Sequence, residues 1–195
     1  MLKKYKPKTI LKRIWFFIWH EDSIWSWIAN IIIALVLVKF IIYPGLGLIL
    51  STQFPIVAVV SSSMEHNADF DEWWSTSSEW YVENGITREQ MIKYPFHNGF
   101  NKGDIMVLKG VKSENLEMGQ ILVFIGNSKD PIIHRVVDKK TENNKYMFTT
   151  KGDNNPKPYP DIGETAITEE KLLGKAIFRM PFLGWVKIIF VSLWR

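Results

Sequence analysis

The longest apolar run of the chain lies close to its N-terminus. Residues 27–50 read WIANIIIALVLVKFIIYPGLGLIL, and Lys39 is the one charged residue among them. A bilayer core about 30 Å thick needs roughly 20 helical residues, so the pattern predicts a transmembrane helix over 27–50. We expect Lys39 to extend toward the outer face, because a charge within a span is costly. A cleaved signal peptide is disfavoured, since the run is long and lacks a small-x-small cleavage site.

After residue 50 the pattern changes to short β-branched runs between turn signals. These runs are PIVAVV, DIMVLKGV, QILVFIG, PIIHRVVDKK, YMFTTKG and LLGKAIFRM. TENNK, between two of them, is typical of a hairpin turn. Several strands without a long helical pattern predict a mainly β domain over 51–180, a small barrel or rolled sheets.

Residues 65–100 interrupt this pattern. They hold seven acidic residues against Arg88 and Lys93, and they are rich in tryptophan. ITREQMIKY has the start of a helix, with Thr87 and Gln90 spaced as a capping box. We therefore expect an insertion with its own, partly helical structure.

The last apolar stretch, residues 181–195, reads PFLGWVKIIFVSLWR. As a helix it is shorter than the usual minimum of about 17 residues for a membrane span. Wound at helical period, its polar residues fall on one stripe: Gly184, Lys187, Ser192 and Arg195. The pattern predicts an interfacial helix or a short membrane helix.

Charge adds an orientation to these elements. The formal net charge is +4, but six of the 24 Lys and Arg lie within residues 1–20, where no acid occurs. The rest of the chain has 18 basic and 20 acidic residues, so it lacks the excess of positive charge expected of a nucleic-acid binder. The positive-inside rule predicts residues 1–26 in the cytoplasm and everything after the span outside the cell membrane. Four tryptophans should lie near the interface: Trp15, Trp19, Trp25 and Trp27.

The residues that could carry chemistry lie in the β domain. There is no cysteine, which excludes a thiol nucleophile, a disulfide and a cysteine metal site. His66 and His97 in the insertion have acidic neighbours, but no pair has a recognisable ligand spacing, and no metal site is predicted. A serine nucleophile needs a base and a group that orients that base.

Three polar clusters offer these parts: SSSM at 61–64, His134 within PIIHRVV, and Asp153 and Asp161 within TKGDNNPKPYPDIG. Taken singly, each has an ordinary alternative. A histidine in a strand is more often a packed core residue, and serines or Gly-Asp-Asn-Asn are common in loops.

In their order along the chain, these blocks resemble type I signal peptidases of the archaeal and endoplasmic-reticulum branch. The blocks are a membrane helix, SSSM, KGDIMVL, PIIHRVV, TKGDNN followed by an aspartate, and LLGKAIFRMPFLGW. Bacterial relatives use a lysine base where this chain has His134. The resemblance covers the chain from about the span to the C-terminus, apart from the insertion.

The resemblance implies a role for each matched residue. Ser63 corresponds to the nucleophile and His134 to the general base. Ser61 corresponds to the serine that holds the oxyanion together with the Ser63 backbone N–H. Asp161 corresponds to the acid that orients the imidazole, and Asp153 to a second family carboxylate. No cofactor is implied.

The chain departs from the family pattern in three places. Ser62 stands where the family more often has glycine, which adds a third hydroxyl beside the nucleophile. PKPYP makes the loop between Asp153 and Asp161 about two residues longer than expected, so either aspartate could orient His134. The insertion replaces a short link before GDIMVL.

The implied function is that of a membrane-bound serine endopeptidase that removes signal peptides from secretory preproteins at the outer membrane face. Its substrates would carry small residues at positions −1 and −3. Its partners would be membrane lipid and the protein-translocation machinery, with no nucleic acid. Two alternatives remain: a membrane-tethered, non-enzymatic binding domain, and a membrane serine protease for other surface-protein precursors.

Overall fold

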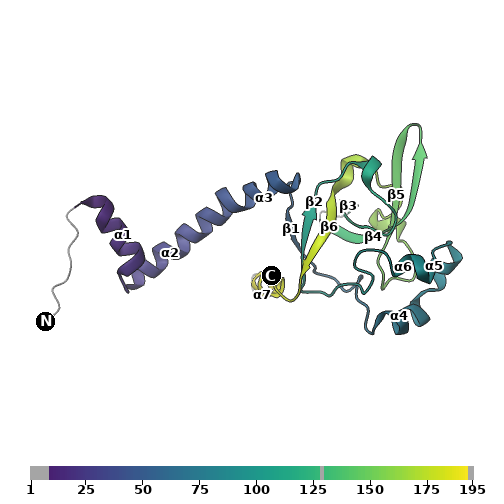
Figure 1. Ribbon diagram of the computed structural model, residues 1–195, viewed down its shortest axis with the longest axis horizontal. Helices are drawn as coiled ribbons and strands as arrows, with labels where there is room; N and C mark the ends of the chain where they lie inside the picture. Colours follow the sequence, from purple (N-terminus) through teal and green to yellow (C-terminus); the bar gives the residue numbers. More distant parts are fainter. Residues whose placement is uncertain (1–8, 128–129, 193–195) are drawn as a thin grey trace. The chain divides into compact units, whose positions relative to one another are not determined.

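The computed structural model describes residues 9–127 and 130–192. Contacts divide the chain into two compact units, with the division between Leu46 and Gly47. Figure 1 shows the elements of both units, and each unit is described by itself.

The N-terminal unit is helical. Helix α1 spans Ile10–His20, and a continuous apolar helix follows over Ile24–Leu50. The latter consists of α2 (Ile24–Leu37), the π-helical η1 (Val38–Ile42) and α3 (Tyr43–Leu50), whose last residues enter the second unit. This helix is long and apolar enough to cross a membrane, and it begins three residues before the predicted span. The predicted N-terminal apolar helix is thus confirmed.

The second unit is built on one antiparallel sheet of six strands. Their order is β1-β2-β6-β3-β4-β5, which places β1 and β5 at the edges. The strands span Ile56–Ala58 (β1), Ile105–Lys109 (β2), Ile121–Ile125 (β3), Pro131–Glu142 (β4), Lys145–Lys151 (β5) and Leu172–Met180 (β6). The predicted mainly β fold is confirmed, and the TENNK turn joins β4 to β5 through Asn143 and Asn144 at positive φ.

The sheet buries apolar side chains on both faces. Along β3, Ile121 and Val123 join one hydrophobic cluster, whereas Leu122 and Phe124 join another. Alternate residues of a strand point to opposite faces, so β3 is a central strand that is buried on both faces from Ile121 to Phe124. This rigid centre holds β4, which carries His134, as the neighbour of β3.

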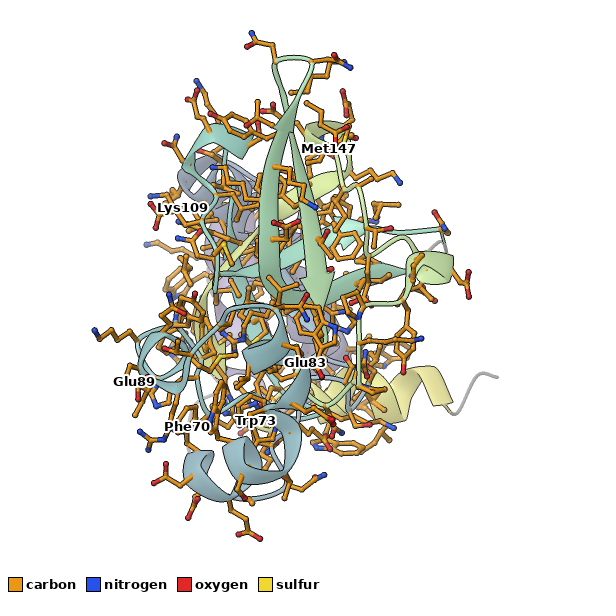
Figure 2. All side chains as sticks on the ribbon, turned by 90° about the vertical axis from the view of Figure 1, so that its right-hand side faces the viewer. Phe70, Trp73, Glu83, Glu89, Lys109 and Met147 are labelled. Atoms are coloured by element: carbon orange, nitrogen blue, oxygen red, sulfur yellow. The ribbon has the colours of Figure 1, made fainter. Side chains whose placement is uncertain are left out.

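Residues 65–100 form three short helices that pack against the sheet. They are α4 (Phe70–Ser77), α5 (Glu79–Glu83) and α6 (Arg88–Met91), and Figure 2 labels Phe70 and Trp73 on the first of them. Their buried side chains cluster around Val137 of β4. The predicted capping box of α6 is confirmed: Thr87 Oγ1 accepts from the Gln90 N–H, and the Gln90 side chain accepts from the Thr87 N–H.

Short 3-10 turns and a final helix complete the unit. The turns are η2 (Ser113–Asn115), η3 (Pro160–Ile162) and η4 (Glu169–Lys171). Helix α7 spans Trp185–Ser192, a shorter stretch than the predicted 181–195. Arg195, part of the predicted polar stripe, and residues 1–8 of the basic N-terminus lie outside the described residues. An interfacial position for α7 stays a prediction.

Candidate active site

Ser63 lies on a turn that is held from two sides. The chain leaves β1 through buried Val59, whose N–H donates to the Asp104 carbonyl at 2.8 Å. Beyond the turn, Met64 is 1% exposed and packs in the same core cluster as Val59. Asn154 fixes the turn itself: its backbone N–H donates to the Ser63 carbonyl at 2.8 Å, and its side-chain amide donates to the Ser62 carbonyl at 3.1 Å.

His134 stands beside this turn. It lies on β4 opposite Leu122, is 3% exposed, and its Nε2 is 2.8 Å from Ser63 Oγ. This distance lies within hydrogen-bond range, so a neutral imidazole is placed to accept the hydroxyl proton of Ser63. The structure therefore brings together Ser63 and His134, which are 71 residues apart in the sequence.

A carboxylate occupies the other side of the imidazole, and it belongs to Glu164. Glu164 Oε1 is hydrogen-bonded to His134 Nδ1, and Glu164 is fully buried. Its Oε2 accepts the Tyr159 backbone N–H at 2.5 Å, and its backbone carbonyl accepts the Thr150 N–H of β5 at 2.9 Å. An anionic carboxylate in this position holds one imidazole tautomer and stabilises the imidazolium.

Asp161, the acid implied by the resemblance, lies elsewhere. It is exposed on η3, and its backbone carbonyl accepts from the Asn127 side chain at 3.0 Å. Two residues further along the chain, Gly163 adopts φ +88, which turns the backbone directly before Glu164. Sequence reasoning missed Glu164. The signal that could have found it was the lengthened PKPYP loop, which moves the aspartate away from its expected place.

Asp153 also fails to reach His134 in the described residues; it is the centre of a second, separate cluster. The carboxylate is fully buried and accepts four hydrogen bonds. The donors are Arg135 Nε at 2.9 Å, Arg135 Nη2 at 2.6 Å, Tyr81 Oη at 2.9 Å and His66 Nε2 at 3.0 Å. Burial alone would raise the pKa of Asp153, but the Arg135 charge and the His66 and Arg135 hydrogen bonds lower it well below its usual range.

Among the other groups of this cluster, all three guanidinium nitrogens of Arg135 donate hydrogen bonds, whereas His66 Nδ1 is buried without a hydrogen-bond partner in the described residues. Arg135 donates to the carbonyls of Pro95, Phe96 and Gly119, each at 2.9 Å. Burial raises the pKa of Tyr81, and the Asp153 charge raises it further, so the hydroxyl stays a donor. We call Asp153, Arg135, His66 and Tyr81 the Asp153 cluster.

Lys151 is a further buried cation next to the Asp153 cluster. It is 1% exposed, donates to the Gly152 carbonyl at 3.1 Å and lies 4.2 Å from the centre of the Tyr81 ring. Burial lowers its pKa to about 8, although the nearby Asp153 and Glu164 charges act in the opposite direction. Because its partners are a backbone carbonyl and an aromatic ring, we assign Lys151 a role in the structure of the domain.

Ser61 is the last of the candidate residues. Its hydroxyl is exposed, and its Oγ is 3.1 Å from Ser63 Oγ. The Ser61 hydroxyl therefore lies directly beside the nucleophile, and in this contact either hydroxyl can be the donor. Among the described residues, no group of three or more His, Asp or Glu side chains could hold a metal ion. The two histidines of the insertion have other partners: His66 is hydrogen-bonded to Asp153, and the His97 ring packs against the Phe70 ring.

A serine, an imidazole and a carboxylate joined in this order define a serine-hydrolase type of site. No family model matches the chain. It is, however, 29% identical over 156 residues to the signal peptidase complex catalytic subunit SEC11 of Metarhizium robertsii, covering 77% of this chain and 72% of that protein. It is 27% identical over 153 residues to human SEC11C, covering 76% of this chain and 63% of that subunit. The chain is thus a homologue of SEC11 signal peptidase catalytic subunits, as its resemblance indicated.

Proposed function

We propose that this chain is a membrane-bound serine endopeptidase that removes signal peptides from secretory preproteins at the outer membrane face. The observation that carries the proposal is the row Ser63–His134–Glu164, in which a hydroxyl, an imidazole and a carboxylate are hydrogen-bonded in sequence. The SEC11 homologues support signal-peptide removal as the reaction. Glu164 takes the role that the resemblance gave to Asp161.

The reaction follows from this row. Ser63 Oγ attacks the scissile carbonyl while His134 Nε2 takes its proton, and Glu164 stabilises the imidazolium. The Ser63 N–H and the Ser61 hydroxyl donate to the oxyanion of the tetrahedral intermediate. His134 then protonates the departing amine, which leaves an acyl-enzyme on Ser63. Water, activated by the same imidazole, hydrolyses this ester and frees the signal peptide.

The substrate would bind as an extended strand. β1 is an edge strand, and residues 57–60 lead directly from it into the nucleophile turn. Backbone hydrogen bonds along this edge would align the precursor, and shallow apolar pockets would accept only small residues at positions −1 and −3.

The apolar helix Ile24–Leu50 would anchor the enzyme as a single pass with its basic N-terminus in the cytoplasm. Lipid surrounds such a helix, and precursors leaving the protein-translocation machinery lie in the same plane. Holding enzyme and precursor in one membrane raises their effective concentration.

The test is cleavage of a model preprotein by the full chain in membranes. We expect the wild type to cut after a small residue and Ser63→Ala to leave the precursor intact. Sequencing the new N-terminus separates signal-peptide removal from cleavage of other surface-protein precursors. A wild type that binds precursor without cutting it would overturn the proposal in favour of a binding domain.

A further inference from the structure

The segment 65–100 does more than cover one side of the sheet. Two of its side chains, His66 before α4 and Tyr81 within α5, donate to Asp153 and so belong to the Asp153 cluster. The His66 side chain is completely buried and its ring stacks on Trp73 at 3.7 Å, within the same segment. Tyr81 is also completely buried. Both donors are therefore held in place by the segment's own packing.

The Asp153 cluster is linked through neighbouring residues to two members of the catalytic row, Ser63 and His134. The Asp153 backbone N–H lies 3.3 Å from Met64 Sδ, and Met64 directly follows Ser63. Asn154, the next residue along, binds the Ser63 carbonyl. Arg135, the main partner of Asp153, directly follows His134 on β4.

We propose that His66 and Tyr81 are positioning residues for the catalytic row, and the proposal rests on the function proposed above. By holding the Asp153 carboxylate, they fix residues 153–154 against the nucleophile turn and Arg135 against the base. The segment 65–100 is thereby a working part of the active site, although in the described part of the chain no hydrogen bond joins any of its residues to Ser63 or His134.

The physical reason lies in the burial of Asp153. Its carboxylate has no access to water, so each lost donor leaves an oxygen under-bonded. The carboxylate, with its backbone, then shifts to recover a partner, and Asn154 shifts with it. A nucleophile and a base 2.8 Å apart tolerate little movement, since a displacement of about 1 Å can cost on the order of 10²-fold in rate.

The experiment compares conservative variants of the full chain in detergent or membranes. Tyr81→Phe removes one hydroxyl, and His66→Phe keeps the stacking on Trp73 but removes the donor. His66→Gln restores an N–H donor near the position of Nε2. Tyr94→Phe is the matched control, because Tyr94 belongs to the same segment and its hydroxyl is not one of the Asp153 donors. Ile86→Ala controls for destabilisation, because Ile86 is buried in the segment's core.

We expect kcat to fall about tenfold in Tyr81→Phe and His66→Phe with little change in KM, and to recover in His66→Gln. Tyr94→Phe and Ile86→Ala should keep the wild-type kcat, although Ile86→Ala unfolds at a lower temperature. Wild-type kcat in both Tyr81→Phe and His66→Phe would overturn the proposal.

A second readout is independent of turnover. The proton between His134 and Glu164 should give a downfield NMR resonance that disappears in His134→Gln. We expect this resonance to shift or broaden in Tyr81→Phe and His66→Phe and to stay unchanged in Tyr94→Phe. If the wild type cleaves no precursor, the proposed function fails, and this resonance alone decides the positioning role: an unchanged signal in both variants refutes it.

Discussion

Glu164 and Asp153 are both fully buried near Ser63 and His134, and they differ in their hydrogen-bond partners. Glu164 binds an imidazole and one backbone N–H, and no cation is hydrogen-bonded to it in the described residues. Asp153 is neutralised by the Arg135 guanidinium and receives two further donors. The Glu164 charge is thus available to stabilise a proton arriving on His134, whereas the Asp153 charge is already compensated. Equal burial therefore does not imply equal roles: in the proposed mechanism the different partners leave Glu164 to assist His134 and Asp153 to hold the structure.

The largest effect should come from removing the base that Glu164 serves. We expect His134→Ala to lower preprotein cleavage by about 10⁴-fold or more, because Ser63 is then left without a proton acceptor. The thermal unfolding of the variant should stay cooperative. Substantial turnover by His134→Ala at neutral pH, measured by precursor cleavage, would mean that another group acts as base.

The second largest effect should come from replacing the acid that orients His134, for which Glu164 and Asp161 are the two candidates. Glu164→Gln should lower kcat on the order of 10³-fold, because an amide cannot stabilise the imidazolium and favours the wrong tautomer. Asp161→Asn should leave kcat within about twofold of the wild type, since Asp161 is exposed. Cleavage kinetics of both variants under identical conditions are the measurement, and the reverse ranking would return the orienting role to Asp161.

Asp153 should matter first for stability. Asp153→Asn leaves the buried Arg135 charge uncompensated, which we expect to lower the free energy of unfolding by about 3 to 5 kcal/mol. The pKa of Asp153 is lower in the folded chain than its ordinary value of 3.8. The unfolded chain therefore binds more protons than the folded chain in acid. The stabilisation by Asp153 is complete above pH 3.8 and is lost as the pH falls below 3.8 toward the pKa of the folded chain.

Chemical denaturation of wild type and Asp153→Asn as a function of pH tests this expectation. The two curves should converge in acid. A constant difference across the acid range would show that the charge of Asp153 is not the source of the stabilisation.

The smallest expected effect belongs to Lys151. Its pKa is lowered from 10.5 to about 8 by burial, so the unfolded chain binds more protons between these values and stability rises with pH across that window. Lys151→Met should therefore be more stable than the wild type below pH 8, by about 2 to 3 kcal/mol. The advantage should vanish above pH 10.5. If Lys151→Met shows no such pH-dependent gain in stability, the Lys151 ammonium of the wild type must be in contact with water.

The contrast between the two carboxylates also marks how far the sequence could predict the site. The strands were predictable from their β-branched runs, and the α6 capping box from four adjacent residues, because both signals are local. Ser63 and His134 were predicted from the order of their motifs. Glu164 was not, because its position depends on the path of a loop whose length differs from the family pattern. The His66–Asp153 contact joins residues 87 apart and leaves no local pattern.

The two ends of that loop are tied down, which determines where its length can change. Asn154 is bound to the nucleophile turn at one end, and the Tyr159 N–H is bound to Glu164 at the other. Only residues 155–158 lie between these anchor points, and Pro156 and Lys157 are exposed. Extra residues placed there would bulge into solvent at a small entropic cost and leave both anchors in register. The 156–157 junction is therefore the place to insert a reporter peptide or a fluorophore beside the active site while keeping the enzyme intact.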